Sequence, residues 1–150
     1  MRGALLLLAG SIVVAGCGGG GGGDRLSQAE FVAKADAICQ EYEAKLDALG
    51  EPQNEDELAE FADKAIPIAK DGRDELGELN PPENQQENYD RWLEQGDRAI
   101  EIVEDLRGAA EDGDRAEIQR IAQEAEQADQ ESNRLAEQLG FKECGATTPS

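Results

Sequence analysis

The chain has no histidine among its 150 residues. This absence excludes the Ser-His-Asp and Cys-His nucleophiles, the HExxH zinc site and the Glu-x-x-His ligands of di-iron helix bundles. Histidine-ligated haem is excluded for the same reason. The sequence also lacks a CxxC pair, a GxGxxG motif and a P-loop. We therefore expect no catalytic residues, no cofactor and no metal site, and we expect that the protein is not an enzyme.

Basic residues are scarce. The chain has 14 Lys and Arg against 34 Asp and Glu, a net charge of −20. Such a charge argues against nucleic acid as a partner, because phosphates would be repelled. The acids indicate either solvated helix faces or attraction of a cationic ligand, and their spacing predicts no defined metal site. Carboxylate pairs also serve glycoside hydrolysis. A packed bundle of this size, however, is expected to offer no cleft for them.

Long hydrophobic runs are missing too. The one apolar run covers residues 4–15, follows Met1-Arg2 and is too short to span a bilayer. It ends in Val14-Ala15-Gly16-Cys17, which resembles the lipobox of bacterial lipoproteins. The resemblance implies that residues 1–16 are a signal peptide, that Cys17 is lipidated, and that the mature chain is held outside the cytoplasm at the cell membrane. A plain secretory signal is the alternative.

Cysteine is rare, with three in the chain. If Cys17 carries lipid, Cys39 and Cys144 are left as a pair in an oxidising compartment, and we expect a disulfide between them. Two free buried thiols are the alternative. Cys39 lies about twelve residues, or roughly 18 Å, into the first predicted helix. The disulfide therefore requires that the first helix project beyond the bundle or that the C-terminal segment fold back.

Glycine is concentrated in one run, Gly18 to Gly23. A glycine run buries no apolar surface and behaves as a flexible coil, so residues 17–26 are predicted to be a tether. At the other end, residues 146–150 are predicted to be a disordered tail. The folded domain is predicted to cover residues 27–145.

Apolar residues at helical spacing predict four helices in that domain, over about 27–50, 54–79, 82–111 and 114–140. Ser27, Asn54 and Asp114 have the form of N-caps, and Asp112-Gly113-Asp114 is interpreted as a turn rather than a calcium loop. The short connections predict an all-α, up-down-up-down antiparallel four-helix bundle. Pairing of the same apolar stripes between chains would instead give an oligomer; a monomer is favoured. The apolar positions are Phe31, Ala35, Ile38, Tyr42, Leu46 and Leu49; Leu58, Ala62, Ala65, Ala69, Gly72, Leu76 and Leu79; Tyr89, Trp92, Leu93, Gly96, Ala99, Ile100, Val103, Leu106 and Ala110; and Ile118, Ile121, Ala125, Ala128, Ser132, Leu135 and Leu139.

Two features within these helices have more than one interpretation. Pro67 removes one backbone donor from the second helix and predicts a kink, either static or part of a hinge. Tyr89 and Trp92 are predicted to be core residues, with a ligand-facing aromatic pair as the alternative.

The mature region resembles a group of small, functionally uncharacterised lipoproteins from high-GC Gram-positive bacteria. The residues that carry the resemblance lie across 27–145: Phe31-Val32-x-x-Ala35-Asp36-Ala37-Ile38-Cys39, Leu79-x-Pro81-Pro82, Tyr89, Trp92-Leu93, Gly113-Asp114 and Leu139-Gly140-Phe141-x-x-Cys144-Gly145. The resemblance implies an anchored helical bundle and supplies no activity and no functional residues.

The sequence thus predicts a lipid-anchored, extracytoplasmic and non-enzymatic lipoprotein that acts as a structural or protein-interaction module of the cell envelope. Its expected partners are the membrane, through the lipid anchor, and an envelope protein. A cation-binding or small-solute-binding lipoprotein is the alternative.

Overall fold

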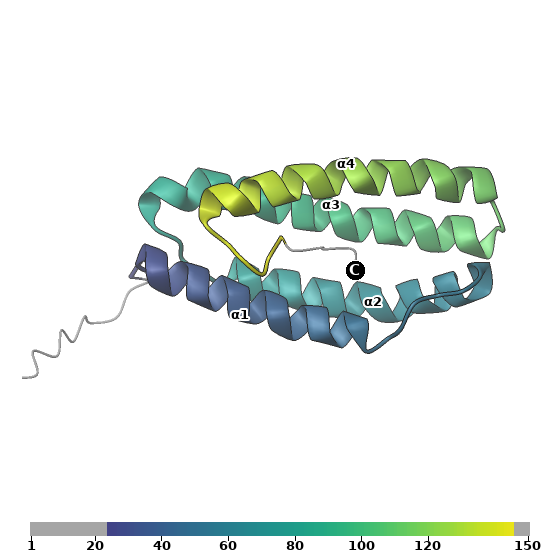
Figure 1. Ribbon diagram of the computed structural model, residues 1–150, viewed down its shortest axis with the longest axis horizontal. Helices are drawn as coiled ribbons and strands as arrows, with labels where there is room; N and C mark the ends of the chain where they lie inside the picture. The colour runs from purple at the N-terminus through teal and green to yellow at the C-terminus, as the bar shows by residue number, and fades with distance from the viewer. Residues whose placement is uncertain (1–23, 146–150) are drawn as a thin grey trace, which may run out of the picture.

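The computed structural model describes residues 24–145 of the chain. Four helices follow one another: α1 (Gln28–Asp47), α2 (Glu55–Gly77), α3 (Gln86–Glu111) and α4 (Arg115–Leu139), with a 3-10 turn, η1 (Glu83–Gln85), before α3. Successive helices reverse direction, with α1 and α2 on one side and α3 and α4 on the other (Figure 1). The predicted all-α four-helix bundle is confirmed.

The helix ends are fixed by local hydrogen bonds that the sequence indicated. Ser27 and Glu30 form a capping box at the start of α1, and Asn54 and Asp114 accept from the backbone N–H three residues later at the starts of α2 and α4. After α4, Gly140 has a φ of 85°, a left-handed conformation that glycine adopts without a steric penalty. α3 ends at Glu111 and Asp114 already caps α4, so the interpretation of Asp112-Gly113-Asp114 as a turn is confirmed.

Proline at position 67 does not end the second helix, since α2 continues as one helix through it. Proline has no N–H, so it cannot donate to the carbonyl of Asp63. Pro67 is exposed, which leaves that carbonyl in reach of water. The structure thus places Pro67 inside α2, and whether α2 hinges there stays a prediction.

An aromatic cluster forms the larger core, where the start of α1 meets the end of α4. The Phe31 ring lies edge-on to Tyr89 with 4.9 Å between centroids, and Phe141 packs against Phe31 and Trp92 at 5.2 and 5.1 Å. The Tyr89 hydroxyl donates to the Leu76 carbonyl at 2.5 Å. Burial raises the pKa of Tyr89, so its phenol stays protonated and remains a donor. The core assignment of Tyr89 is confirmed.

A second, smaller cluster joins α3 to α4 towards the opposite end of the bundle. Ile102, Ala109 and Ile121 are its buried members. Ile102 was not among the predicted core positions, whereas Ala99, which was, is exposed. The apolar stripe of α3 is wide enough to contact both α2 and α4. Ile102 and Ala109, which pack in the cluster with α4, lie next to the predicted apolar positions Val103 and Ala110.

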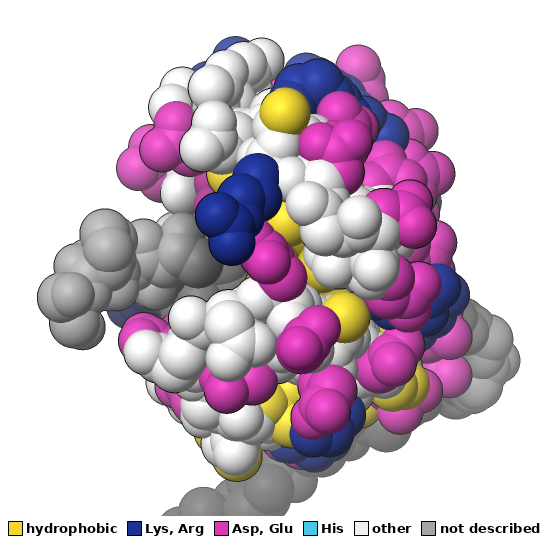
Figure 2. Space-filling model, turned by 90° about the vertical axis from the view of Figure 1, so that its right-hand side faces the viewer, with side chains coloured by type: hydrophobic (Ala, Val, Ile, Leu, Met, Phe, Trp, Pro, Cys, Tyr) yellow, Lys and Arg dark blue, Asp and Glu magenta, His cyan; other side chains and the backbone are white. Residues whose placement is uncertain are grey.

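At the end of the molecule that carries the α1–α2 and α3–α4 connections, acidic side chains gather along one side, with basic side chains interspersed (Figure 2). Several basic residues pair across helices: Lys70 with Glu104, Arg107 with Asp63, Arg98 with Glu124, Arg91 with Glu131, and Arg115 with Glu55. Exposed pairs contribute about 0–1 kcal/mol each. They keep a strongly acidic surface compatible with close helix packing.

The described chain begins with residues that are attached to the bundle. The Leu26 N–H donates to the Asn80 carbonyl at 2.8 Å, and the Arg25 guanidinium donates to the Pro81 carbonyl at 2.9 Å. The predicted tether, residues 17–26, therefore ends in a segment fixed to the α2–α3 connection. The predicted signal peptide, the lipidation site Cys17 and the tail 146–150 lie outside the described residues. Within residues 24–145, no helix is both long and apolar enough to cross a membrane.

Candidate ligand-binding groove

A disulfide joins the middle of α1 to the C-terminal segment, as predicted from the cysteine count. The sulfurs of Cys39 and Cys144 are 2.06 Å apart and the Cα atoms 5.2 Å apart. After α4 the chain turns back and runs between α4 and α1 (Figure 1). Of the two arrangements that the sequence left open, the structure thus has the folded-back C-terminal segment.

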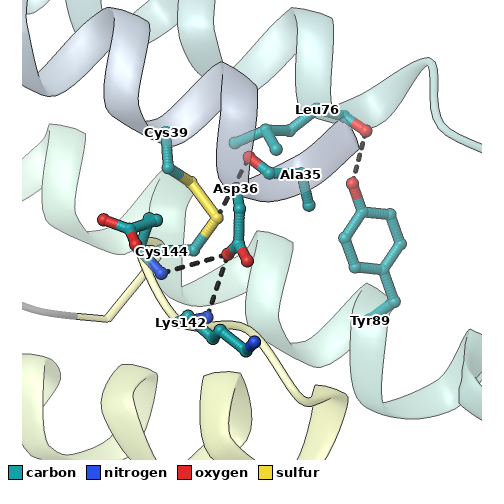
Figure 3. Close-up of a disulfide and its surroundings, with 8 residues drawn as sticks. Ala35, Asp36, Cys39, Leu76, Tyr89, Lys142 and Cys144 are labelled. Atoms are coloured by element: carbon teal, nitrogen blue, oxygen red, sulfur yellow. Dashed lines mark hydrogen bonds between the residues drawn. A yellow bond between two sulfur atoms is a disulfide. The ribbon is translucent and has the colours of Figure 1, made fainter. Parts of the chain in front are cut away.

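Asp36 holds this segment from the side of α1 (Figure 3). Its carboxylate accepts the backbone N–H groups of Lys142 and Glu143 at 2.9 and 3.1 Å. The Cys144 sulfur lies 3.3 Å from the Ala35 carbonyl oxygen. A disulfide sulfur carries no proton, so this is a contact rather than a hydrogen bond. The segment 141–145 is fixed by the disulfide, by the buried Phe141 ring and by two backbone donors.

An open groove runs along the middle of the bundle, where α1 and α4 do not pair directly. The extensive helix pairs are α3–α4 and α2–α3, followed by α1–α2. The cavity has a volume of about 410 Å³, within the range of small-molecule sites. All four helices and the segment 143–145 line it: Ile38, Cys39, Tyr42, Glu43 and Leu46 from α1; Ala69, Gly72, Arg73 and Leu76 from α2; Trp92, Leu93, Gly96, Ala99, Ile100 and Val103 from α3; and Asp129, Ser132 and Asn133 from α4.

Small residues explain why the groove stays unfilled. Ala69, Gly96 and Ala99 line it with little or no side chain. At Gly72 the two helices approach so closely that an added Cβ would lie 2.7 Å from Cγ of Tyr42. The Tyr42 ring covers this position, and its hydroxyl donates to Glu75 at 3.0 Å. The Tyr42 side chain, which comes from α1, is thereby held against α2 and forms part of the groove wall.

The walls of the groove differ in polarity. Those from α1, α2 and α3 are mainly aliphatic and aromatic, whereas α4 contributes Asp129, Ser132 and Asn133. Arg73 is the one cationic side chain in the described lining. Its guanidinium is engaged by both carboxylate oxygens of Asp97, at 2.7 and 2.8 Å. The groove thus has apolar walls, a polar edge and no unpaired positive charge among the described residues.

Asp129 is an exposed acid at the edge of the groove. Partial desolvation raises the pKa of this carboxyl group, and no cation pairs with it in the described part of the chain. Desolvation disfavours the charged form of an acid unless an opposite charge compensates. A carboxylate at the edge of an apolar groove, without such compensation, is a candidate recognition group.

Trp92 belongs both to the core and to the groove. It is 7% exposed, stacks on Tyr89 with 5.9 Å between ring centroids, and also lines the cavity. Its indole N–H is buried and finds no acceptor among the described residues. Buried N–H groups in native structures usually have a partner. The core prediction for Trp92 is confirmed. Trp92 also lines the groove whereas Tyr89 does not, so the alternative of an aromatic pair that faces a ligand together stays untested.

The expectation that the bundle has no cleft was wrong. Several of the predicted apolar positions in the middle parts of α1 and α3 are only partly buried and line the groove, among them Ile38, Tyr42, Ile100 and Val103. The hydrophobic period identifies an apolar face but not the element that covers it. Small side chains and a folded-back segment, rather than an α1–α4 pair, occupy this part of the bundle.

The remaining chemistry-bearing residues are dispersed. Within the described residues, no group of three or more Asp, Glu or Cys side chains is arranged to hold a metal ion. Ser132 lines the groove, but the chain has no histidine that could activate its hydroxyl. The sequence signal for the groove was indirect: glycine and alanine at seam positions of α2 and α3.

Comparison with known protein families, with curated proteins and with solved structures finds no match to this chain. The arguments that follow therefore rest on the geometry and chemistry of the described residues and on the sequence.

Proposed function

We propose that this chain is a non-enzymatic, lipid-anchored binding protein on the extracytoplasmic side of the cell membrane, and that its groove takes up a small, largely apolar ligand. The observation that carries the proposal is the groove of about 410 Å³, whose exposed lining is mainly apolar. Small-molecule sites are typically apolar pockets with a few polar groups, and helix bundles place them between helices.

The lining of the groove favours a small molecule over a partner helix. Side chains of all four helices and of the segment 143–145 converge on it, with mainly apolar walls and a few polar groups at one edge. This arrangement is typical of small-molecule sites, whereas an amphipathic helix docks along an apolar strip several turns long. The small-solute alternative is thus better supported than the protein-interaction module.

The anchor and the location are proposed from the sequence, and one structural feature supports them. The residues 1–16 have the form of a signal peptide, and Cys17 stands where a lipobox cysteine would be. The Cys39–Cys144 disulfide supports an oxidising compartment, because such bonds persist outside the cytoplasm. A diacyl anchor would hold the protein firmly, since each buried CH₂ contributes about 0.8 kcal/mol.

The anchor is tested in the native host. Intact-mass analysis of the membrane fraction is expected to find an acylated chain that begins at Cys17. Cys17→Ser is expected to move the protein out of the membrane fraction. An unmodified N-terminus in membrane-bound protein would contradict the anchor but not the groove.

The groove is tested by titrating the mature chain carrying Cys17→Ser with 1-decanol, followed by calorimetry and by the fluorescence of Trp92. Trp92 is the one tryptophan of the chain and lines the groove, so its emission is expected to change on binding. Ala99→Phe fills the groove from an exposed position and is expected to abolish binding. Ala122→Phe, at an exposed position of α4 outside the groove, is the matched control. Binding weaker than about 1 mM, or binding unchanged by Ala99→Phe, would refute the proposal.

A further inference from the structure

We infer that the ligand of the groove is a small cationic amphiphile, with its apolar body against α1, α2 and α3 and its positive charge beside Asp129. This inference rests on the ligand binding proposed above and adds the chemical class of the ligand. It concerns one molecule with two parts, an apolar chain or ring system and an ammonium-type group.

The apolar part is matched by three walls of the groove. Ile38 and Leu46 face it from α1, and Leu93, Ile100 and Val103 face it from α3. These side chains are only partly buried in the structure. A ligand that covers them removes apolar surface from water, at about 25 cal/mol per Å². A purely ionic ligand would leave this surface exposed.

The charged part is matched by acidic side chains from α4, from the C-terminal segment and from the end of α1. Glu43, Asp129 and Glu143 line the groove, and none of these side chains pairs with a cation among the described residues. Arg73, the lining cation, is held by Asp97 in a two-point ion pair at 2.7 and 2.8 Å. An anionic head group would meet three carboxylates and would need to displace Asp97. A cationic head group meets complementary charge without displacing anything.

A further observation concerns Asp129 itself. Partial desolvation beside the groove raises the pKa of its carboxyl group, whereas a cation bound beside it would favour the ionised form. The carboxylate and the cationic group of the ligand would therefore stabilise each other.

The test compares three probes that share a ten-carbon chain: decyltrimethylammonium, 1-decanol and decyl sulfate. The two ionic probes are titrated below their micelle-forming concentrations and 1-decanol below its solubility limit. The protein is the mature chain carrying Cys17→Ser, at physiological salt so that long-range attraction is screened. Tetramethylammonium, which has the charge but no chain, is the fourth probe. Calorimetry gives the affinities, and Trp92 fluorescence reports on the groove.

The cation is expected to bind about tenfold more tightly than the alcohol, and the sulfate more weakly than both. Asp129→Asn is expected to weaken binding of the cation about three- to tenfold and to leave 1-decanol unchanged. Glu126→Gln removes the same charge from an exposed position of α4 outside the groove and is expected to leave both affinities unchanged.

Each possible result of the titrations has a defined consequence. Equal affinity for the cation and the alcohol overturns the inference but leaves the proposed apolar groove intact. A preference for the cation that survives Asp129→Asn, or that Glu126→Gln reduces equally, shows generic charge attraction and also overturns the inference. Tetramethylammonium binding as tightly as the long-chain cation overturns the amphiphile. If no probe binds, the inference and the proposed ligand binding both fail.

Discussion

Removal of the disulfide is the sharpest test of how the groove is built. The double variant Cys39→Ala/Cys144→Ala opens a loop whose ends are 105 residues apart in sequence. In the chain-entropy model a loop of about 100 residues corresponds to about 4.7 kcal/mol at 25 °C, with 2–4 kcal/mol typical of measured disulfides. A domain of this size has a total unfolding free energy of about 5–15 kcal/mol. We therefore expect the variant to fold but to lose about 2–4.7 kcal/mol.

The assay is urea denaturation of the mature chain carrying Cys17→Ser, followed by the circular dichroism of the helices. The midpoint is expected to fall and the slope to increase, because the denatured chain without the disulfide is more expanded and exposes more surface. Adding a reductant to the chain that retains both Cys39 and Cys144 should reproduce the loss, whereas adding it to the double variant should change nothing.

Hydrogen exchange locates the effect. The amides of Lys142 and Glu143 donate to Asp36. Their exchange rates are expected to increase more between the parent and the double variant than the exchange rates of the amides of α3. A loss below about 1 kcal/mol, or unchanged exchange at Lys142 and Glu143, would refute the reasoning that the disulfide fixes the segment that closes the groove.

Four other substitutions test the packing and the electrostatics. Phe141→Ala removes a buried ring that contacts three others and should cost about 3–5 kcal/mol in urea denaturation; a loss below 1 kcal/mol would contradict its core role. Gly72→Ala places a Cβ 2.7 Å from the Tyr42 ring and should cost about 1–3 kcal/mol of unfolding free energy. Gly96→Ala is the control: its Cβ would come no closer than 3.7 Å to Arg73, and it should stabilise α3 by about 0.5–1 kcal/mol. Equal effects of the two substitutions would contradict the close approach at Gly72. Burial raises the pKa of Asp129 from the ordinary 3.8, so the protonated form favours the native state, and that advantage is lost as pH rises through the raised pKa. Asp129→Asn should therefore be more stable than the parent near pH 7, with the difference vanishing below about pH 3; a variant that is less stable at pH 7 would contradict this sign.

The ends of the helices were predictable because they are encoded within a few residues. Ser27 and Glu30 cap each other three positions apart, and Gly140 ends α4 through a backbone conformation that other residues rarely adopt. Such signals need no knowledge of the tertiary structure. The same is true of the order and direction of the helices, which short connections leave little freedom to vary.

The pairing of the cysteines was predictable by elimination, but the path of the chain to Cys144 was not. The count of cysteines left one intramolecular pair if Cys17 carries lipid. It did not say whether α1 projects or the C-terminal segment folds back. That choice depends on Phe141, which packs into the aromatic cluster, and on Asp36, which binds the backbone after it.

The groove was not predictable from the hydrophobic pattern. The period of a helix shows which face is apolar, and Tyr42 and Val103 lie on such faces. Whether an apolar face is covered depends on contacts between helices, which here include the close approach at Gly72 and the intervening C-terminal segment (Figure 1). These are long-range contacts, and no local signal in the sequence encodes them.

The sequence by itself determined the helices, their caps, their alternating direction, the acidic character of the surface and the absence of histidine-based chemistry. These follow from local hydrogen bonding, periodicity and composition. Only the tertiary structure decided that α1 and α4 leave a groove between them in the middle of the bundle, that Trp92 and Asp129 line the same groove, and that the disulfide holds the C-terminal segment beside it. The reason is that a ligand site depends on which surfaces remain uncovered after packing, and packing depends on residues that are distant in the chain.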